Sequence, residues 1–458
     1  MRSKILRQSK ALQAQTSSLR IRCLLLLISV LSAAAIAQPT TESSMPRDRL
    51  VPADSGAGKR YLERVQPIIE KRCVVCHGCY DSPCQFNQGS PEGLDRGASK
   101  EKVYNGGRLS AAEPSRLFED GRTTAEWRAR DFYPMLNEGE QNPHNNLNNS
   151  VFYQMLALKR EHPLPAEAVL DSRFELGLNR KQECPKPEEF EAFKKKRPLW
   201  GMPYGLPGLS EGEFSTLKQW LASGAAMTAP QPLKPAIAAQ VAKWEQFLNG
   251  DSLKEQLMAR YLYEHWFLAH LYFSDTDTGV FFRIARSSTP PGKPMNHIAT
   301  RRPYDDPGVE RVYYRLWPDH TTVLDKTHMP YALNAQRMQW LSELFLEPDY
   351  QVKQLPSYEP TVAANPFIAF NPIPVEHRWR FLLEEAQYTV MNFIKGPVCR
   401  GQTSLNVIRD HFWVFFSHPK FEDGDEADAF LNAQEVNLRI PVEVGSEAKP
   451  ISTWMEYS

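Results

Sequence analysis

The chain has 458 residues, a length that favours two or three domains over one. Hydrophobic residues make up 42%, which argues against wholesale disorder. The 54 basic and 54 acidic residues balance, and this argues against nucleic acid as a main partner. The 36 prolines against 24 glycines indicate long ordered loops around a helical framework.

The first 37 residues have the pattern of a secretory signal peptide. A basic stretch precedes an apolar run over residues 23–36, and an Ala-Ile-Ala tripeptide that ends at Ala37 is a suitable cleavage site. The run is short for a membrane span, which needs about 20 residues, so an uncleaved anchor is the less favoured alternative. We expect export to the periplasm, with residues 38–59 as a linker and a mature chain that is soluble or peripheral.

A Cys-x-x-Cys-His motif is formed by Cys73, Cys76 and His77. Its two thiols can add across the vinyl groups of a porphyrin, and the two-residue spacer keeps both sulfurs along one side of the ring. His77 follows directly, so its imidazole can reach the iron from the proximal face. The motif therefore predicts a covalently attached haem c.

Two other kinds of site use similar residues. Cys79 and Cys84 lie close to the motif, so the cluster is compatible with zinc, and the Cys-x-x-Cys spacing also occurs in thioredoxin-like redox pairs. A redox fold would show a βαβ pattern ahead of the motif. The residues ahead of the motif instead have helical spacing, as in a c-type cytochrome, and haem is favoured. They are Tyr61, Val65, Ile68 and Ile69.

Four cysteines of the mature chain remain after haem attachment. In an oxidising compartment they can form disulfides, but their spacing leaves the connectivity open. They are Cys79, Cys84, Cys184 and Cys399.

A second cytochrome-like segment lies far downstream around Met202. A Gly-Met-Pro loop precedes a capping box of Ser210 and Glu213, which marks the start of a helix. The thioether of Met202 is our predicted sixth iron ligand, because methionine is a common partner of a His-ligated c-type haem. Met135 and Met155 are weaker candidates, and a core or loop methionine is the alternative. The expected apolar face and C-cap of the helix are Phe214, Leu217, Trp220, Leu221 and Gly224.

These segments predict a mainly α fold in two parts. A cytochrome c-like haem domain is expected over residues 60–227, with a large insertion over residues 85–199 built above the haem edge. Residues 228–236 read as a proline-rich linker. Residues 237–458 are expected to form a mixed, mostly helical second domain.

Two histidines lie in a segment of the second domain, residues 241–271, that is mostly helical in pattern. On one helix His265 and His270 would be about 140° apart, so they cannot bind one metal ion from one face. We interpret both as hydrogen-bonded core residues. The alternative is that one of them faces the haem.

Long motifs throughout the chain resemble those of the fatty acid cis/trans isomerases. The resemblance covers nearly all of the mature chain and includes the haem motif and the Met202 loop. It implies a periplasmic haem enzyme that converts cis double bonds of phospholipid acyl chains to trans without moving the bond. Trans chains pack like saturated ones, so the product stiffens the membrane under stress. The motifs are residues 72–80, 93–100, 200–206, 260–265, 325–331, 392–401 and 410–416.

The resemblance also implies a mechanism and partners. A ferric haem can draw π density from an alkene and lower its bond order, with His77 as the proximal ligand and a loosely held Met202 that yields to the double bond. Unsaturated phospholipids or fatty acids would be the substrates, and the cytochrome c maturation machinery would attach the haem. Family chains run well beyond this length, which implies a second domain truncated at its C-terminus.

Three further features can be interpreted either as functional or as structural. The basic run over residues 194–197 is either a solvated face or a contact for anionic lipid headgroups, at about 1 kcal/mol per residue. His328 is either structural or a reserve axial ligand. Asp410 and His411 belong either to a core segment or to the lining of an acyl cavity.

A periplasmic mono-haem electron-transfer cytochrome is the alternative function. It rests on Cys73, Cys76, His77 and Met202 alone and leaves the insertion and the second domain unexplained. A haem sensor is a third possibility, but no output domain is visible in the sequence.

Overall fold

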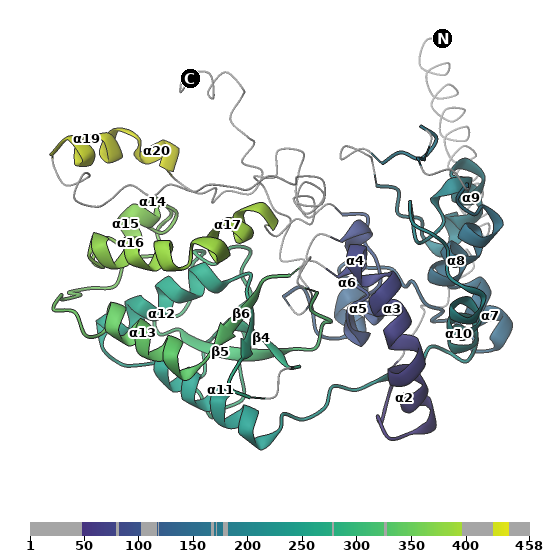
Figure 1. Cartoon of the computed structure of the whole chain (residues 1–458), viewed down its shortest axis with the longest axis horizontal. Helices are drawn as coiled ribbons and strands as arrows, with labels where there is room; N and C mark the ends of the chain where they lie inside the picture. Colours follow the sequence, from purple (N-terminus) through teal and green to yellow (C-terminus); the bar gives the residue numbers. More distant parts are fainter. Residues whose placement is uncertain are drawn as a thin grey trace, which may run out of the picture. The chain divides into compact units, whose positions relative to one another are not determined.

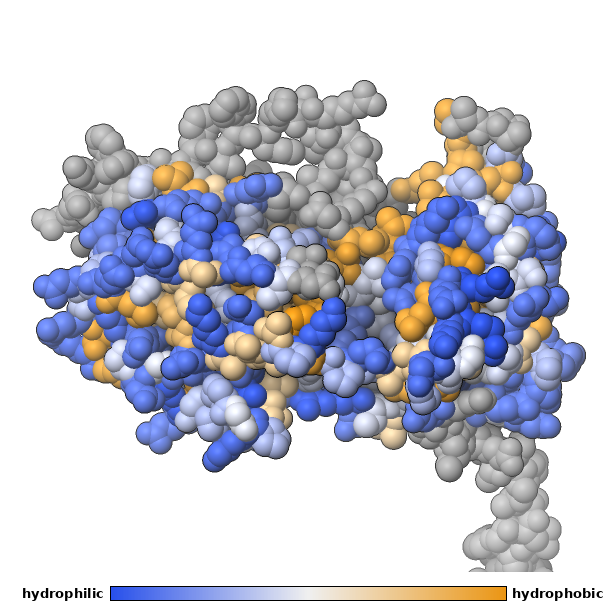
Figure 2. Space-filling model, turned by 60° about the horizontal axis from the view of Figure 1, so that its bottom comes forward, coloured by the Kyte–Doolittle hydropathy of each residue, from blue (hydrophilic) through white to orange (hydrophobic). Residues whose placement is uncertain are grey.

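The computed structural model describes residues 48–78, 82–101, 117, 119–165, 169–170, 172–176, 182–276, 279–324, 328–395 and 425–438 (Figure 1). The predicted signal peptide, Cys79, Cys399, the 410–416 motif and the end of the chain lie outside these residues. Contacts between backbones group Pro46–Ser458 as one compact unit, in which the buried side chains form two large cores. None of the described helices has the length and apolar character to cross a membrane. On the face drawn in Figure 2, most of the coloured surface residues are hydrophilic.

The first core is built almost entirely from short helices. The haem motif forms α4, at the end of a nearly continuous helical segment that starts at α2 (Figure 1). Tyr61, Val65 and Ile69 are buried along this segment at the predicted helical spacing. The elements are α2 (Gly56–Arg60), the π-helical turn η1 (Tyr61–Val65), α3 (Gln66–Arg72), α4 (Val74–His77), η2 (Pro83–Gln85), α5 (Pro91–Arg96), α6 (Thr124–Ala129), α7 (Pro143–Asn148), α8 (Val151–Glu161), η3 (Pro187–Glu189), α9 (Phe190–Lys196), η4 (Pro198–Trp200) and α10 (Glu211–Ala222).

The predicted insertion is an integral part of this core. Helix α8 lies in the middle of residues 85–199 and contacts α7, α9, α10 and η4. Its buried face is formed by Val151, Phe152, Met155, Leu156 and Leu158. The insertion therefore supplies core side chains instead of covering a smaller, separate domain. The mainly helical prediction is confirmed, whereas a cytochrome c-like arrangement stays a prediction.

Helix α10 begins and ends as its sequence predicts. The Ser210 hydroxyl accepts a hydrogen bond from the Glu213 amide (3.3 Å), and the Glu213 carboxylate accepts one from the Ser210 amide (2.8 Å). Gly224 has φ +98° just beyond the last turn, a conformation that favours glycine. Strand β1 (Leu50–Val51) then pairs in parallel with β2 (Met227–Thr228), which closes the first core. The buried face of α10 contains Leu217, Trp220 and Leu221.

The second core packs helices against a four-stranded sheet of order β5-β4-β3-β6. Burial alternates along β3 and β6 and along the first four residues of β4 and β5, so one face of the sheet contributes to the second core. Strand β4 is antiparallel to β3 and β5, and β6 is parallel to β3. The elements are α11 (Pro235–Leu248), α12 (Leu253–Trp266), β3 (His270–Phe273), β4 (Phe281–Ser287), β5 (Tyr313–Asp319), β6 (Pro330–Leu333), α13 (Ala335–Phe345), α14 (Pro360–Ala363), α15 (Pro366–Ala369), α16 (Val375–Glu384), α17 (Ala386–Lys395), α19 (Asp425–Ala433) and α20 (Glu435–Leu438).

The mostly helical pattern predicted over residues 241–271 is confirmed, and it is divided into two helices followed by a strand. Helix α11 ends at Leu248. The side chain of the next residue, Asn249, donates to the Tyr314 carbonyl oxygen in β5 (2.7 Å) and accepts from the Tyr314 amide (2.8 Å). A new capping box at Ser252 then starts α12. His270 begins a strand that pairs with β6, so it does not share a helix with His265. Long-range pairing with the sheet overrides the local helical pattern here.

Gly201 packs directly on α8. A Cβ atom at this position would lie 2.2 Å from the backbone nitrogen of Lys159, so only glycine allows this approach. Gly212, in the first turn of α10, has no atom within 4 Å of the equivalent position. The two glycines are therefore a matched pair, one constrained by packing and one not.

We expect Gly201→Ala to lower the free energy of unfolding by about 1–3 kcal/mol, because the clash involves backbone atoms that cannot turn away. Gly212→Ala should raise it by up to about 1 kcal/mol, because alanine is the better helix former. Urea unfolding monitored by circular dichroism measures both values. Equal effects at the two positions would contradict the observed packing.

Candidate functional site

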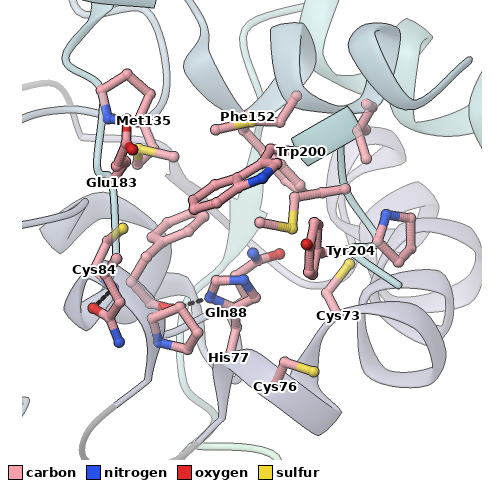
Figure 3. Close-up of a pocket in the computed structure, with 18 of the residues that line it drawn as sticks. Cys73, Cys76, His77, Cys84, Gln88, Met135, Phe152, Glu183, Trp200 and Tyr204 are labelled. Carbon is pink, nitrogen blue, oxygen red and sulfur yellow. Dashed lines mark hydrogen bonds between the residues drawn. The ribbon is translucent and has the colours of Figure 1, made fainter. Parts of the chain in front are cut away.

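A largely apolar cavity within the first core brings the predicted haem residues together (Figure 3). It contains about 1130 Å³ of space, part of it open to solvent, which is ample for a large ligand. Cys73, Cys76, His77 and Met202 all line it, although Met202 lies far from the motif in the sequence. Figure 3 shows Phe152 and Trp200 across this space from Cys76 and His77, with Tyr204 beside Cys73. The other lining residues are Arg72, Pro83, Cys84, Phe86, Gln88, Tyr133, Met135, Phe152, Met155, Leu156, Gln182, Glu183, Pro185, Phe193, Trp200, Pro203, Tyr204 and Leu206.

The His77 imidazole is held in one orientation. Its Nδ1 lies 2.9 Å from the carbonyl oxygen of Phe86, and the Phe86 ring contacts the imidazole edge-on with centroids 5.7 Å apart. Since a carbonyl oxygen only accepts hydrogen bonds, Nδ1 carries the proton and Nε2 has the free lone pair. Burial lowers the pKa of His77 to about 4, so the ring is neutral at neutral pH. This is the form in which histidine binds a metal ion.

The first thiol of the motif is unsuited to act as a thiolate. Cys73 is buried between α3 and α4, and burial raises the pKa of its thiol to about 12. Zinc sites and redox pairs need thiolates, whereas a thioether to a porphyrin carries no charge. Cys76 is exposed at the edge of the cavity. The burial of Cys73 therefore suits haem attachment better than the zinc and redox alternatives.

A disulfide joins two walls of the cavity. Cys84 in η2 is bonded to Cys184, which settles one of the pairings left open by the sequence. Cys84 is consequently not available as a zinc ligand. Gln182, Glu183 and Pro185, on the far side of the bond, also line the cavity. The disulfide thus ties the segment ahead of α9 to the loop that follows the haem motif.

The Met202 loop is attached both to α8 and to the motif. The amide of Met202 donates to the carbonyl oxygen of Met155 in α8 (3.0 Å). Arg72, which precedes the first motif cysteine, donates from Nη2 to the carbonyl oxygens of Pro207 and Gly208 at 2.9 and 2.6 Å. These contacts keep the loop at the cavity wall. They also join it to Arg72, the residue next to Cys73.

Three methionines, rather than one, reach the cavity. Met135 and Met155 are more than nine-tenths buried and line it together with Met202. Any of the three thioethers is chemically suited to the sixth iron position. Met202 as that ligand therefore stays a prediction.

The aromatic wall was missed at the sequence level. Phe152 and Trp200 stand across the cavity from the motif (Figure 3), and Trp200 contacts Phe193 and Tyr204 with ring centroids 6.3 and 5.7 Å apart. Phe152 and Met155 are one helical turn apart on the same face of α8, a spacing that indicates a buried helix face. That spacing predicts burial, but not burial against a ligand cavity.

Comparison with known families decides the class of the protein. A family model described as fatty acid cis/trans isomerase (CTI) matches residues 112–458. The chain belongs to the fatty acid cis/trans isomerase family. The match includes the Met202 loop and the whole second core, and it begins after Cys73, Cys76 and His77. No curated protein and no solved structure matches the chain.

The three other histidines considered in the sequence, His265, His270 and His328, are not among the lining residues of the cavity, although His328 packs beside Gly78. His265 Nδ1 is 2.7 Å from the carbonyl oxygen of Tyr261, and its ring packs against Tyr261 and Phe381. The rings of His270 and His328 meet with centroids 4.6 Å apart. These contacts favour the structural interpretation of all three. Asp410 and His411 lie outside the described residues.

The basic run of the isomerase is largely paired with carboxylates. Lys194 contacts Glu161 at 2.7 Å, Lys196 contacts Glu183 at 3.0 Å, and Arg197 contacts Glu183 at 2.5 Å. Hydrogen bonds from Arg197 and Lys196 lower the pKa of Glu183, which keeps this lining residue ionised and paired. Three of the four charges are thus partly neutralised, and the structure favours a solvated face over a headgroup contact.

We expect replacement of both Cys84 and Cys184 by serine to lower the free energy of unfolding by about 2–5 kcal/mol, because a long loop loses its closure. Urea unfolding of the oxidised proteins measures the difference. With excess reductant the wild type and the variant should unfold at nearly the same urea concentration. A difference that persists under reduction would mean that the serines act through packing and not through the bond.

Proposed function

We propose that this isomerase carries a covalently attached haem c in the described cavity and acts on unsaturated acyl chains of membrane phospholipids in the periplasm. One observation carries the proposal. The neutral, oriented imidazole of His77 and both motif cysteines line the same apolar cavity as Met202. The family match supplies the class of reaction and of substrate.

The residues of the cavity fit a haem. Cys73 and Cys76 would form the two thioethers, and Nε2 of His77 would bind the iron. One of three nearby methionines is available for the sixth position, with Met202 as the predicted one. When bound, ferric haem supplies an electrophilic iron that draws π density from a double bond and lowers its bond order.

The protein itself binds, orients and shields the acyl chain. Phe152, Leu156, Phe193 and Trp200 give an apolar lining, and burial of hydrocarbon contributes about 0.8 kcal/mol per methylene. Rotation about a double bond needs no proton transfer. The cavity agrees with this requirement, because its carboxylate, Glu183, is already paired with Lys196 and Arg197.

Two exposed leucines provide a route from the bilayer to this cavity. Leu206 lines the cavity and is 43% exposed, and Leu176 is 56% exposed. They belong to adjacent segments, because a Cβ on Gly205 would lie 3.0 Å from Leu176 and the Tyr204 hydroxyl donates to the Glu175 carbonyl oxygen (3.2 Å). We propose that this leucine rim enters the acyl boundary of the membrane, where exposed apolar side chains are stabilised.

We expect expression in a host that lacks trans fatty acids, but attaches c-type haem, to give trans acyl chains measurable by gas chromatography. His77→Ala should abolish the product and change the haem absorption spectrum, because the iron loses its proximal ligand. His144→Ala, at an exposed position on α7, is the control and should change neither. Undiminished trans product from the His77 variant, or a wild type without covalent haem, would overturn the proposal.

We expect the double change of Leu176 and Leu206 to serine to weaken binding to vesicles of unsaturated phosphatidylethanolamine and phosphatidylglycerol roughly thirtyfold, since each leucine contributes about 1 kcal/mol. Isomerisation in vesicles should fall with binding, and it should fall more than isomerisation of a detergent-dispersed fatty acid. Leu62→Ser with Leu253→Ser changes two leucines that are 40% and 36% exposed elsewhere and serves as the control. Equal losses in the two double variants would exclude the leucine rim.

A further inference from the structure

Gln88 is a polar side chain of the cavity whose role the proposed reaction leaves unassigned. It lies beside His77 (Figure 3) and is only 6% exposed. Its Oε1 is buried and has no hydrogen-bond partner among the described residues. A buried polar atom left unpaired costs about 1–3 kcal/mol, so such atoms in folded proteins call for an explanation.

Two uncharged polar side chains of the lining already have partners. Gln182 Oε1 accepts a hydrogen bond from the Cys84 amide (3.2 Å). The Tyr204 hydroxyl donates to the Glu175 carbonyl oxygen. The Gln88 carboxamide therefore differs from these neighbours in being both buried and unpaired.

The backbone around Gln88 cannot easily move the side chain out of the cavity. The backbone amide of Gln88 donates to the carbonyl oxygen of His77 (2.7 Å), and the Asn87 side chain accepts from the backbone amide of Gly89 (2.8 Å). From the second half of the chain, the Thr322 amide donates to the Gly89 carbonyl oxygen (2.8 Å), and a Cβ on Gly89 would lie 2.5 Å from the Thr321 methyl group. The loop is thus held from both sides, and Gln88 is kept in the cavity wall.

The partner of this carboxamide must itself be polar, which excludes an acyl chain. Haem has two propionate carboxylates, and a carboxylate in an apolar cavity needs hydrogen-bond donors. Arg72 is the cationic residue among the described lining residues. Its Nη2 is bound to two backbone carbonyl oxygens, and its Nε is buried without a hydrogen-bond partner, 3.8 Å from a carboxylate oxygen of Glu213. A 180° rotation of the Gln88 side-chain carboxamide places its NH₂ group where Oε1 lies and leaves the shape of the side chain unchanged.

We propose that the Gln88 carboxamide donates a hydrogen bond to a haem propionate and thereby limits the negative charge that acts on the iron. This inference rests on the proposed haem binding. Loss of the donor leaves the propionate charge less compensated, and a negative charge near the iron favours the ferric over the ferrous state. Gln88 is thus a positioning residue that keeps the reduction potential high and the ferric iron electrophilic.

The test compares three variants of the full haem-loaded chain. Gln88→Leu removes the donor at nearly constant volume, Gln88→Glu replaces it with a second carboxylate, and Gln182→Leu is the control at a lining amide that already has a partner. Redox titration measures the midpoint potential, and resonance Raman spectra report the propionate bending band. The haem content of each variant is measured alongside.

We expect Gln88→Leu to lower the midpoint potential and shift the propionate band with full haem content, and Gln88→Glu to lower the potential further. Gln182→Leu should change neither quantity. An unchanged potential and band in Gln88→Leu, or equal shifts in Gln182→Leu, would overturn the assignment. A wild-type protein that carries no covalent haem would instead overturn the proposed function, so the two failures are distinguishable.

Discussion

The hydrogen bond between His77 Nδ1 and the Phe86 carbonyl oxygen determines what the cavity can bind. It fixes the tautomer, and with it the nitrogen that has a free lone pair. Burial keeps the ring neutral, and the same burial keeps Cys73 protonated. A site with a neutral imidazole and a neutral thiol is poorly suited to a zinc ion, which needs anionic sulfur, but it suits a porphyrin held by thioethers.

This hydrogen bond depends on a loop that both cores support. Phe86 leads into the segment that contains Gln88 and Gly89, and Thr322 of the second core is hydrogen-bonded to that segment. The second core also reaches the first through Thr322 Oγ1 and Glu70, and through His297 and Glu119. The second core therefore contributes to the geometry of the cavity although none of its described residues lines it. The second half of the chain therefore has a structural role, which is to hold the loop that orients His77.

Family membership and cavity chemistry come from different parts of the chain. The family match starts at residue 112, beyond the Cys-x-x-Cys-His motif, and covers the Met202 loop and the second core. The cavity joins the two regions, because Arg72 binds the carbonyl oxygens that follow Met202 and the Cys84–Cys184 bond closes the opposite wall. An electron-transfer cytochrome would need only the motif and one methionine, so it does not account for this larger construction.

Local sequence was sufficient wherever neighbours along the chain determine structure. The capping box at Ser210, the C-cap glycine at Gly224 and the buried spacing ahead of the motif all follow from contacts within one or two turns. The Cys-x-x-Cys-His spacing was also recognisable in the sequence, and the haem that it predicts stays a prediction. The tertiary structure decided the features that depend on distant residues. These are the strand at His270, the Cys84–Cys184 pairing, the aromatic wall and the burial of the Gln88 side-chain oxygen without a partner. Each of these arises from groups that packing brings together, and a local sequence pattern does not predict which distant groups come into contact.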